Sequence, residues 1–504
     1  MKIKKEIIER IGLYVGLFVF LFFLIFEPLN AAKSTNNMAG AALLMAIWWM
    51  TEALPLAATS LVPLFLFPLL SIEDSKTTSL QYINSTIFLF LGGFILANAM
   101  KQWDLHKRIS LTIIKKIGGG TKSILAGFMI SAWFLSMFLT NTAVTIMMLP
   151  IALAVIMELE ETVGEEKSRT FSIALMLGLA YSASMGGIAT LVGTVPNLAF
   201  KTIFEEQYPG GPEISFATWM GFALPISVIM LVLLWFVLTK IVFKFDNNLK
   251  VDTNLINDQY NKLGRMTYEQ KIVVGVMSTT ALLWIFRKNI SFGLFTIPGW
   301  STIMPFKEYI DDSTVAIFMS VLLFMIPSKS TLNNRRILNS DIINKLPWDI
   351  LLLFGGGFAL AKGFQTTGLS ELIGNSIGTL GNVPGYVVAF VVCFIIIFLT
   401  ELTSNTATVY TFLPILASIS AAMKIDPLLL MIPATLSASF AFMLPVATPP
   451  NAIVFSSGRL KIADMVRAGI WLNLISAFLL HILFFFIGGY ILGIDSSIFP
   501  DWAK

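Results

Sequence analysis

The stretch FLTNTAVTIMMLPIA, residues 138–152, places a polar Thr-Asn-Thr step at 140–142 inside an apolar segment. The second half of the chain repeats this pattern in LTSNTATVYTFLPILA, residues 402–417, around a Ser-Asn-Thr step at 404–406. In both stretches a Leu-Pro-Ile follows, and nine positions separate the asparagine from the proline. Polar residues that loosen the backbone are costly in lipid unless they line a cavity or another protein surface. A matched pair of such steps in two halves of a membrane protein points to a transporter's binding site.

Composition places the chain in a lipid bilayer. Its 504 residues are 56% hydrophobic and 13% charged, whereas soluble domains carry about 25% charged residues. Because each membrane span needs about 20 apolar residues, a chain this apolar has to place many segments in lipid. The net charge of +4 gives no signal for nucleic-acid binding. The single cysteine excludes a disulfide framework or a cysteine metal cluster within one chain.

Charged segments predict the orientation of the chain. Four basic residues precede the first apolar run, 11–26, and no small-residue cleavage site follows it, so we expect a retained helix with a cytoplasmic N-terminus. Residues 101–122 hold six basic residues against one acid, which also favours the cytoplasmic face. The loop 158–166 holds five glutamates and no basic residue, so we expect it outside. The lysine-rich N-terminus, the lack of an organelle signal and a compact linker between the halves indicate a multi-pass protein of a bacterial plasma membrane.

Several features recur at a fixed distance, which indicates an internal repeat. Gly357 follows Gly93, and Asn405 follows Asn141, by the same 264 positions. A Thr-Val-Pro-Asn at 194–197 recurs as Thr-Pro-Pro-Asn at 448–451, offset by 254, so a short deletion separates the features in the second half. Paired broken segments favour an inverted repeat. We expect an N-terminal helix at 1–37, a first repeat at 38–243, a linker at 244–268 and a second repeat at 269–504.

Helix breaks at these motifs would free backbone groups of both polarities. Asn, Thr and Ser side chains compete for backbone hydrogen bonds, proline stops a helix, and glycine lets backbone approach a ligand. Freed carbonyls together with hydroxyls suit a hard cation such as Na⁺, and freed N–H groups at a positive helix end suit a carboxylate. The glycine segments at 92–93 and 355–357 are expected to form re-entrant hairpins or kinked helices.

Structural roles compete with these functional interpretations. A single Asn-Thr step in a membrane helix is more often a helix–helix hydrogen bond than a ligand site, and only the repetition of the step favours function. Glu52 is an acid beside a membrane segment, which makes it a functional candidate, although a position at a helix end would make its role structural or interfacial.

The motifs resemble the divalent anion/sodium symporter family, the di- and tricarboxylate transporters, which carries a Ser-Asn-Thr motif in each repeat. The chain has this motif in full at 404–406 and as a threonine variant at 140–142, and the segment WWMTEALP at 48–55 and the Pro-Asn loops are also similar. The resemblance implies an all-α polytopic membrane protein with two inverted repeats, about eleven transmembrane helices, two re-entrant hairpins and unwound helix breaks at the site. It also implies a homodimer in which a transport domain moves against a scaffold by an elevator mechanism.

The family pattern also implies binding residues. The substrate carboxylates would be held by Asn141, Thr142, Thr194, Ser404, Asn405, Thr406, Thr448 and Pro449. A first sodium site would use Ser136, Thr140, Asn141 and Gly193, and a second would use Thr400, Thr403, Asn405 and Ala447. Na⁺ would be the only cofactor, with no organic cofactor. The expected partners are a small dicarboxylate, the bilayer and a second copy of the chain, and no nucleic acid.

The function that these residues imply is Na⁺-coupled transport of C4-type dicarboxylates such as succinate, malate and fumarate, with 2-oxoglutarate as a further candidate. Thr140 adds a methyl group where the family has serine, and this methyl could crowd a cation shell. A sodium-independent dicarboxylate exchanger is therefore an alternative, as is a transporter of another anion such as citrate or sulfate. An intramembrane enzyme would need a catalytic pair, and the two histidines are isolated. A channel usually builds its pore from symmetry-related subunits, whereas this repeat lies within one chain.

Overall fold

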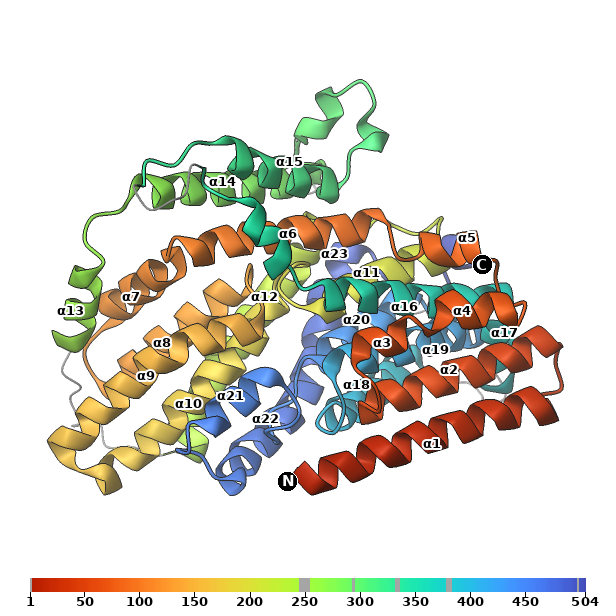
Figure 1. Ribbon diagram of the computed structural model, residues 1–504, viewed down its shortest axis with the longest axis horizontal. Helices are drawn as coiled ribbons and strands as arrows, with labels where there is room; N and C mark the ends of the chain where they lie inside the picture. The colour runs from red at the N-terminus through yellow and green to blue at the C-terminus, as the bar shows by residue number, and fades with distance from the viewer. Residues whose placement is uncertain (1, 244–253, 292–294, 331–335, 378–382, 496–497) are drawn as a thin grey trace.

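The computed structural model describes residues 2–243, 254–291, 295–330, 336–377, 383–495 and 498–504. Helices make up nearly all of the regular structure in these ranges (Figure 1), apart from a two-residue antiparallel pairing of β1 (Ile290–Ser291) with β2 (Thr296–Ile297). The first part of the expected linker, 244–253, lies outside the described residues, and its later part contains α13 (Asn254–Lys262). The expected boundary at residue 37 falls inside α2, so the domain division stays a prediction.

The first half of the chain forms the following elements in order. They are α1 (Lys2–Phe26), α2 (Lys33–Thr51), α3 (Leu56–Ser60), α4 (Val62–Leu69), α5 (Ser75–Leu80), α6 (Ser85–Gln102), α7 (Leu105–Ile117), α8 (Thr121–Ser136), α9 (Asn141–Val163), α10 (Glu165–Gly187), α11 (Val195–Gln207), α12 (Phe216–Phe236) and the π-helix η1 (Val237–Val242).

The second half begins with α14 and ends with a short 3-10 turn. Its elements are α14 (Tyr268–Ile285), η2 (Trp300–Ile303), η3 (Lys307–Tyr309), α15 (Asp312–Met325), η4 (Ser340–Lys345), α16 (Trp348–Thr366), α17 (Leu369–Ile377), α18 (Gly385–Leu399), α19 (Asn405–Met423), α20 (Pro427–Ala438), α21 (Pro449–Ser456), α22 (Ile462–Leu483), the π-helix η6 (Phe484–Gly488), α23 (Gly489–Leu492) and η7 (Asp501–Ala503).

Many of the helices are apolar enough for a bilayer, which confirms the prediction of an all-α polytopic membrane protein. By length and composition alone, seven helical stretches among the described residues could cross a membrane: Glu6–Phe26, Ser75–Gln102, Asn141–Val163, Glu165–Gly187, Phe216–Val242, Asn405–Met423 and Ile462–Leu492. Five shorter apolar stretches, such as Thr121–Ser136 and Gly385–Leu399, accompany them. The count of eleven spans stays a prediction.

The two halves repeat the same order of elements. A helix pair (α8 and α9, or α18 and α19) is followed by a broken helix (α10 and α11, or α20 and α21) and then by a long helix (α12 or α22) that ends in a π-helix. In Figure 1, α10 and α11 run from left to right across the molecule, whereas α20 and α21 run from right to left. This opposite direction favours an inverted repeat over a parallel one.

The glycine segments lie inside continuous helices, so of the two forms expected there, a re-entrant hairpin or a kinked helix, the hairpin is wrong. Gly92 lies within α6, where a Cβ would come within 2.6 Å of Ala316 Cβ on α15. Gly357 lies within α16, where a Cβ would come within 1.9 Å of the Tyr410 ring on α19. These glycines therefore allow close packing between helices. Hairpins form instead at the two Asn-Thr steps, where short turns join α8 to α9 and α18 to α19.

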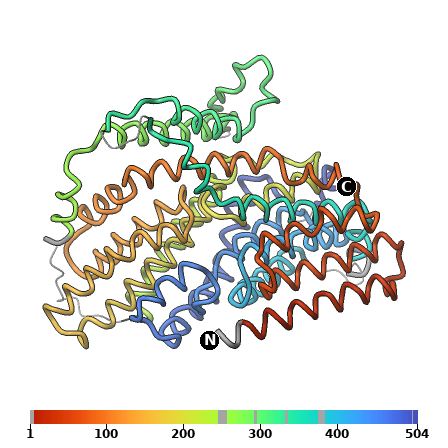
Figure 2. Tube along the Cα trace, in the orientation of Figure 1, coloured from red at the N-terminus to blue at the C-terminus, as the bar shows by residue number. Residues whose placement is uncertain are grey.

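The hairpin also corrects the expected position of the acidic loop. α8 and α9 pack together, and Figures 1 and 2 show that both reach the left edge of the molecule at the ends away from their shared turn. The basic segment 101–122 leads into α8, and the acidic loop 158–166 follows α9. Both segments therefore lie on one side of the molecule, and the expectation of opposite sides is wrong. The prediction from the net charge of the loop was wrong here because a hairpin returns the chain to the side from which it started.

An ion cluster, with Arg287 and Asp312 buried and Glu213 and Lys288 more exposed, joins the ends of α12, α14 and α15. Arg287 Nε donates to Asp312 Oδ1 over 2.6 Å, and the backbone N–H of Phe216 donates to Asp312 Oδ2 over 2.7 Å. Arg287 also pairs with Glu213, which Lys288 contacts as well. Burial opposes ionisation of Glu213, but the hydrogen bond from Lys288 and the charge of Arg287 hold its pKa below the usual value. The cluster thus fixes three helix ends with charges that partner one another.

Candidate functional site

The first Asn-Thr step forms the turn between α8 and α9. α8 ends at Ser136, and Ser136 Oγ donates to Asn141 Oδ1 over 2.5 Å. Thr140 is the N-cap of α9, and its Oγ1 accepts the backbone N–H of Ala143 over 3.3 Å. The predicted break at this step is present because the hydroxyl and amide side chains replace the helical hydrogen bonds that the turn removes.

The second break lies between α10 and α11, at residues 188–194. Asn197 closes it, since its Nδ2 donates to the carbonyls of Gly187 (3.0 Å) and Thr190 (2.7 Å). Thr190 Oγ1 donates in turn to the carbonyl of Met137 in the hairpin turn, over 2.5 Å. The Pro-Asn motif therefore holds the broken helix against the hairpin.

Oxygen atoms from both breaks converge around Gly193. A Cβ at Gly193 would lie 2.4 Å from the Gly187 carbonyl oxygen and 2.9 Å from the Ser136 carbonyl oxygen. A Cβ at Gly187 would lie 2.4 Å from Asn141 Oδ1, which also accepts from Ser136 Oγ. We call these atoms the oxygen cradle: the carbonyls of Ser136 and Gly187, Asn141 Oδ1 and Ser136 Oγ. These uncharged oxygens gather where the packing admits only glycine, and they are donors of the kind that suits Na⁺, which transporters hold with unwound backbone carbonyls.

Three of the four residues expected at the first sodium site, Ser136, Asn141 and Gly193, thus lie together. The fourth, Thr140, uses its hydroxyl to cap α9. Gly187 joins the group without having been predicted. Its signal in the sequence was its position at the end of an apolar run in a glycine-rich break.

The second repeat builds the same tethers with different partners. Thr400 Oγ1 donates to Asn405 Oδ1 over 2.7 Å, in place of the contact between Ser136 and Asn141. Asn451 Nδ2 donates to the carbonyls of Ala441 and Leu444, both over 3.0 Å. This second bridge repeats the first at an offset of 254 positions: Asn451 corresponds to Asn197, Ala441 to Gly187, and Leu444 to Thr190. The repeat seen in the sequence is therefore a repeat of hydrogen bonds.

The second repeat also differs from the first. Thr403, expected at the second sodium site, bonds through its hydroxyl to Thr408 (2.8 Å) and to the carbonyl of Leu399 (3.1 Å). Ala447 carries a Cβ where the first repeat has Gly193. Thr400 and Asn405 are thus joined as expected, whereas Thr403 belongs to a different hydrogen-bond chain and Ala447 leaves less room than glycine.

The residues expected to bind substrate lie mainly at the edge of the buried core. Half-buried positions are occupied by Asn141, Thr142, Thr194, Ser404, Asn405 and Thr406. Thr448 is buried and caps α21 by accepting the backbone N–H of Asn451, and Pro449 is exposed. Partial exposure at two helix N-termini would let free backbone N–H groups meet an anion. A substrate site that joins both steps stays a prediction.

The two repeats interlock at their breaks. α11 packs against α19 and α20 of the other repeat, and α21 packs against α9 and α10. Tyr181 of α10 donates its hydroxyl to the carbonyl of Phe442, in the break before α21. Each broken helix therefore crosses into the other repeat beyond its break, which brings the four breaks into one unit.

Glu401 is a buried residue of this unit that the sequence motifs did not reveal. It directly follows Thr400 in the turn between α18 and α19, and its side chain reaches the break between α20 and α21. An acid within the run TELTSNT was the signal that could have identified it. Glu52, by contrast, is exposed at the C-cap of α2 with a left-handed backbone (φ 51°), which favours a role at a helix end.

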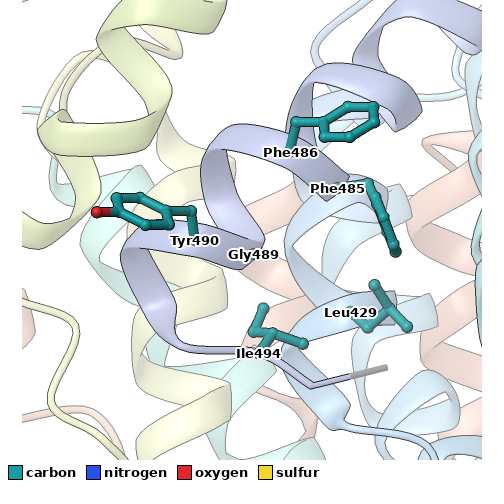
Figure 3. A pocket seen from close by; sticks show the side chains of 6 residues that line it. All are labelled: Leu429, Phe485, Phe486, Gly489, Tyr490 and Ile494. Atoms are coloured by element: carbon teal, nitrogen blue, oxygen red, sulfur yellow. The ribbon is translucent and has the colours of Figure 1, made fainter. Parts of the chain in front are cut away.

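An apolar pocket of about 270 Å³ lies between α20 and the segment of η6 and α23. Figure 3 shows its lining, which consists of Leu429, Phe485, Phe486, Gly489, Tyr490 and Ile494. The only polar side-chain atom of this lining is the Tyr490 hydroxyl, which points away from the other labelled side chains. The pocket lacks groups that could hold carboxylates, so it is not the substrate site.

The sequence matches the family described as the sodium:sulfate symporter transmembrane region over residues 6–494. It is 42% identical, over 493 residues, to a sodium-dependent dicarboxylate transporter of Staphylococcus saprophyticus, covering 97% of this chain and 93% of that protein. A protein of the same description from Staphylococcus aureus is 43% identical over 493 residues, covering 97% of this chain and 92% of the relative.

Two solved structures share the fold at low sequence identity. The Neisseria gonorrhoeae protein MtrF, described as illuminating a class of antimetabolite efflux pumps, has a TM-score of 0.57 at 13% identity, over 90% of this chain and 95% of that one. The Alcanivorax borkumensis transporter YdaH has a TM-score of 0.56 at 13% identity, over 90% and 99% of the two chains. At this identity the likeness concerns the fold alone.

Proposed function

The chain belongs to the sodium:sulfate symporter family, as its resemblance to divalent anion/sodium symporters predicted, and from this premise we propose that it is a secondary transporter that couples Na⁺ to the uptake of C4-type dicarboxylates. Its Staphylococcus relatives, which are described as sodium-dependent dicarboxylate transporters, support the substrate class and the cation. The membrane would be a bacterial plasma membrane, with the N-terminus in the cytoplasm.

The observation that carries this proposal is the oxygen cradle beside the N-terminus of α9. The cradle offers uncharged oxygens to a cation, and the first backbone N–H groups of α9 face an anion with the positive end of the helix dipole. The breaks at 137–140, 188–194, 400–404 and 439–448 contain no lysine or arginine. Bound Na⁺ would therefore supply the positive charge that a dianion needs at these breaks.

In this site, two asparagines would each contact both the substrate and a cation site. Asn141 and Asn405 would hold the substrate through their amide groups while their Oδ1 atoms face the hydroxyls of Ser136 and Thr400. Each asparagine would thus connect a cation site to the substrate, so that one ligand orders the turn for the other. Such coupling is a difference in free energy between singly and doubly occupied states.

The position of Thr140 gives no support to dicarboxylate exchange without sodium. Its hydroxyl caps α9 and is not one of the cradle oxygens, so its methyl group replaces a serine hydrogen at a helix cap. This position removes the reason for expecting the methyl group to crowd a cation shell.

An elevator motion is the transport step that we propose. The interlocked unit of α8–α12 and α18–α22 contains all four breaks, and it would move against the remaining helices, where α6 packs on α15 and α1 packs on α2. Figures 1 and 2 show the layer of α14 and α15 along one edge of the molecule, outside this unit. In a homodimer, contacts with the second copy would hold these remaining helices still during the motion.

Competition for uptake tests the substrate class. Purified protein in liposomes, with Na⁺ outside, should take up labelled succinate, and excess unlabelled fumarate or malate should suppress this uptake. Sulfate should leave it nearly unchanged because two carboxylates set apart match two helix N-termini, whereas sulfate spans only one. Stronger competition by citrate or sulfate than by malate would contradict the assignment to C4 dicarboxylates.

A further inference from the structure

Glu401 is a buried acid that the proposed transport step does not yet use. It lies in the turn between α18 and α19, and the residue is only 3% exposed. Its Oε1 accepts the backbone N–H groups of Phe442 (2.7 Å) and Met443 (2.8 Å), and Asn473 Nδ2 (2.7 Å). Its Oε2 accepts the N–H of Leu444 (3.0 Å). All four partners donate, and N–H donors around a carboxyl group stabilise its ionised form.

The first repeat makes the same tether without a charge. Met137 stands 264 positions before Glu401, and Thr190 stands 254 positions before Leu444, the two offsets of the repeat. In the first repeat the Thr190 hydroxyl donates to the Met137 carbonyl over 2.5 Å, and in the second the Leu444 N–H donates to the Glu401 carboxylate. A neutral bond is therefore enough to hold a hairpin turn against a break, and the tether does not explain the charge.

The charge of Glu401 also has no positive partner in the part of the chain that the structure describes. The ion pairs of these residues involve other acids. A buried charge without a partner is costly, and an acid within a membrane segment is a functional candidate. A cation beside Thr400, the neighbour of Glu401, would balance the charge.

We propose that Glu401 is a positioning residue whose fixed negative charge makes the second cation site bind Na⁺ more tightly than the first and makes dicarboxylate binding depend on that Na⁺. The carboxylate does not ligate the cation, because its oxygens are occupied by four donors. It acts through space, by attracting a cation to the Thr400–Asn405 turn and by repelling a dianion while the turn has no cation. The inference rests on the proposed symport, and it adds an order: the second site fills first.

The test measures Na⁺ binding without transport. Purified protein, without dicarboxylate, is melted over a series of Na⁺ concentrations with K⁺ keeping the ionic strength constant, since a bound cation raises the melting temperature. Glu401→Gln removes the charge, and Asn473→Lys neutralises it by placing an ammonium beside it. Both variants should raise the Na⁺ concentration for half-maximal stabilisation about tenfold, because either removes an attraction between close charges. Asn473→Ala is the matched control, which loses one hydrogen bond but keeps the charge.

The outcomes separate charge from tethering. Asn473→Ala should lower the melting temperature at every Na⁺ concentration and leave the Na⁺ midpoint within about twofold of wild type, because the attraction between charges remains. If Glu401→Gln does not fold, Asn473→Lys carries the test, because it keeps the glutamate. A variant that lacks the net charge but keeps the wild-type midpoint would overturn the role of Glu401 alone. A wild-type protein that Na⁺ stabilises no better than K⁺ would overturn both this role and the proposed symport.

Discussion

Asn141→Ala should abolish Na⁺-driven succinate uptake. The change removes Oδ1, which accepts from Ser136 and lies in the oxygen cradle, and it removes the amide that would meet the substrate. Loss of a group that orients metal ligands costs about 10–100-fold in metal affinity, and Asn141 would serve both ligands, so we expect uptake to fall by more than about 100-fold. Asn405→Ala should do the same in the second repeat, where Asn405 accepts from Thr400.

A second asparagine supplies the control for this prediction. Asn98 is half-buried in α6, and among the described residues its Nδ2 donates only to the carbonyl of Phe94 in its own helix, over 2.9 Å. Asn98→Ala should therefore keep uptake close to that of wild type. Initial rates of labelled succinate uptake, normalised to protein in the liposomes, check all three variants. Uptake by Asn141→Ala at the level of Asn98→Ala would remove Asn141 from the site.

Gly193→Ala should remove Na⁺ binding at the first site and lower the melting temperature, because backbone at the two breaks must shift to admit the methyl group. The added Cβ would lie 2.4 Å from the Gly187 carbonyl oxygen and 2.9 Å from that of Ser136, and backbone atoms cannot rotate away from it. Gly193 does not have a left-handed backbone, so the effect of alanine comes from these contacts and not from its φ angle. Because the methyl fills the cradle, we expect Na⁺ affinity at this site to fall by more than about 100-fold.

Two matched variants show whether the space in the cradle is the cause. Gly275 lies in α14, and a Cβ added there would meet no atom within 4 Å, so Gly275→Ala should change neither uptake nor Na⁺ dependence. Ala447→Gly removes the Cβ at the corresponding position of the second repeat and should not weaken Na⁺ dependence, since it adds space. Uptake and Na⁺-dependent melting measured side by side check these variants. Wild-type Na⁺ dependence in Gly193→Ala would show that the cradle does not hold a cation.

The sequence predicted the positions of the breaks well because their causes are local. Asn141 and Asn405 compete for backbone hydrogen bonds wherever they stand in a helix, and the Pro-Asn motifs stop a helix for equally local reasons. The pairing of Asn197 with two carbonyls, and its repetition by Asn451, could not be read from the pattern. It needs the folded turn that brings those carbonyls together.

The failed predictions concern features that tertiary contacts decide. Gly92 and Gly357 allow neighbouring helices to approach closely, and the same residues in a sequence are equally compatible with a hairpin. The acidic loop 158–166 lies on the side of the basic segment because α8 and α9 form a hairpin, which a count of charges cannot show. Glu401 was missed because its partners lie about forty residues later, in a break whose position relative to the turn only the fold determines.

One measurement, made under crossed conditions, tests whether the paired helix breaks couple Na⁺ to dicarboxylate uptake. Labelled succinate uptake into proteoliposomes is measured with and without an inward Na⁺ gradient, and with and without unlabelled dicarboxylate inside. We expect uptake that requires Na⁺ and proceeds without internal substrate. Uptake that requires internal dicarboxylate and ignores Na⁺ would contradict this coupling and would establish an exchanger.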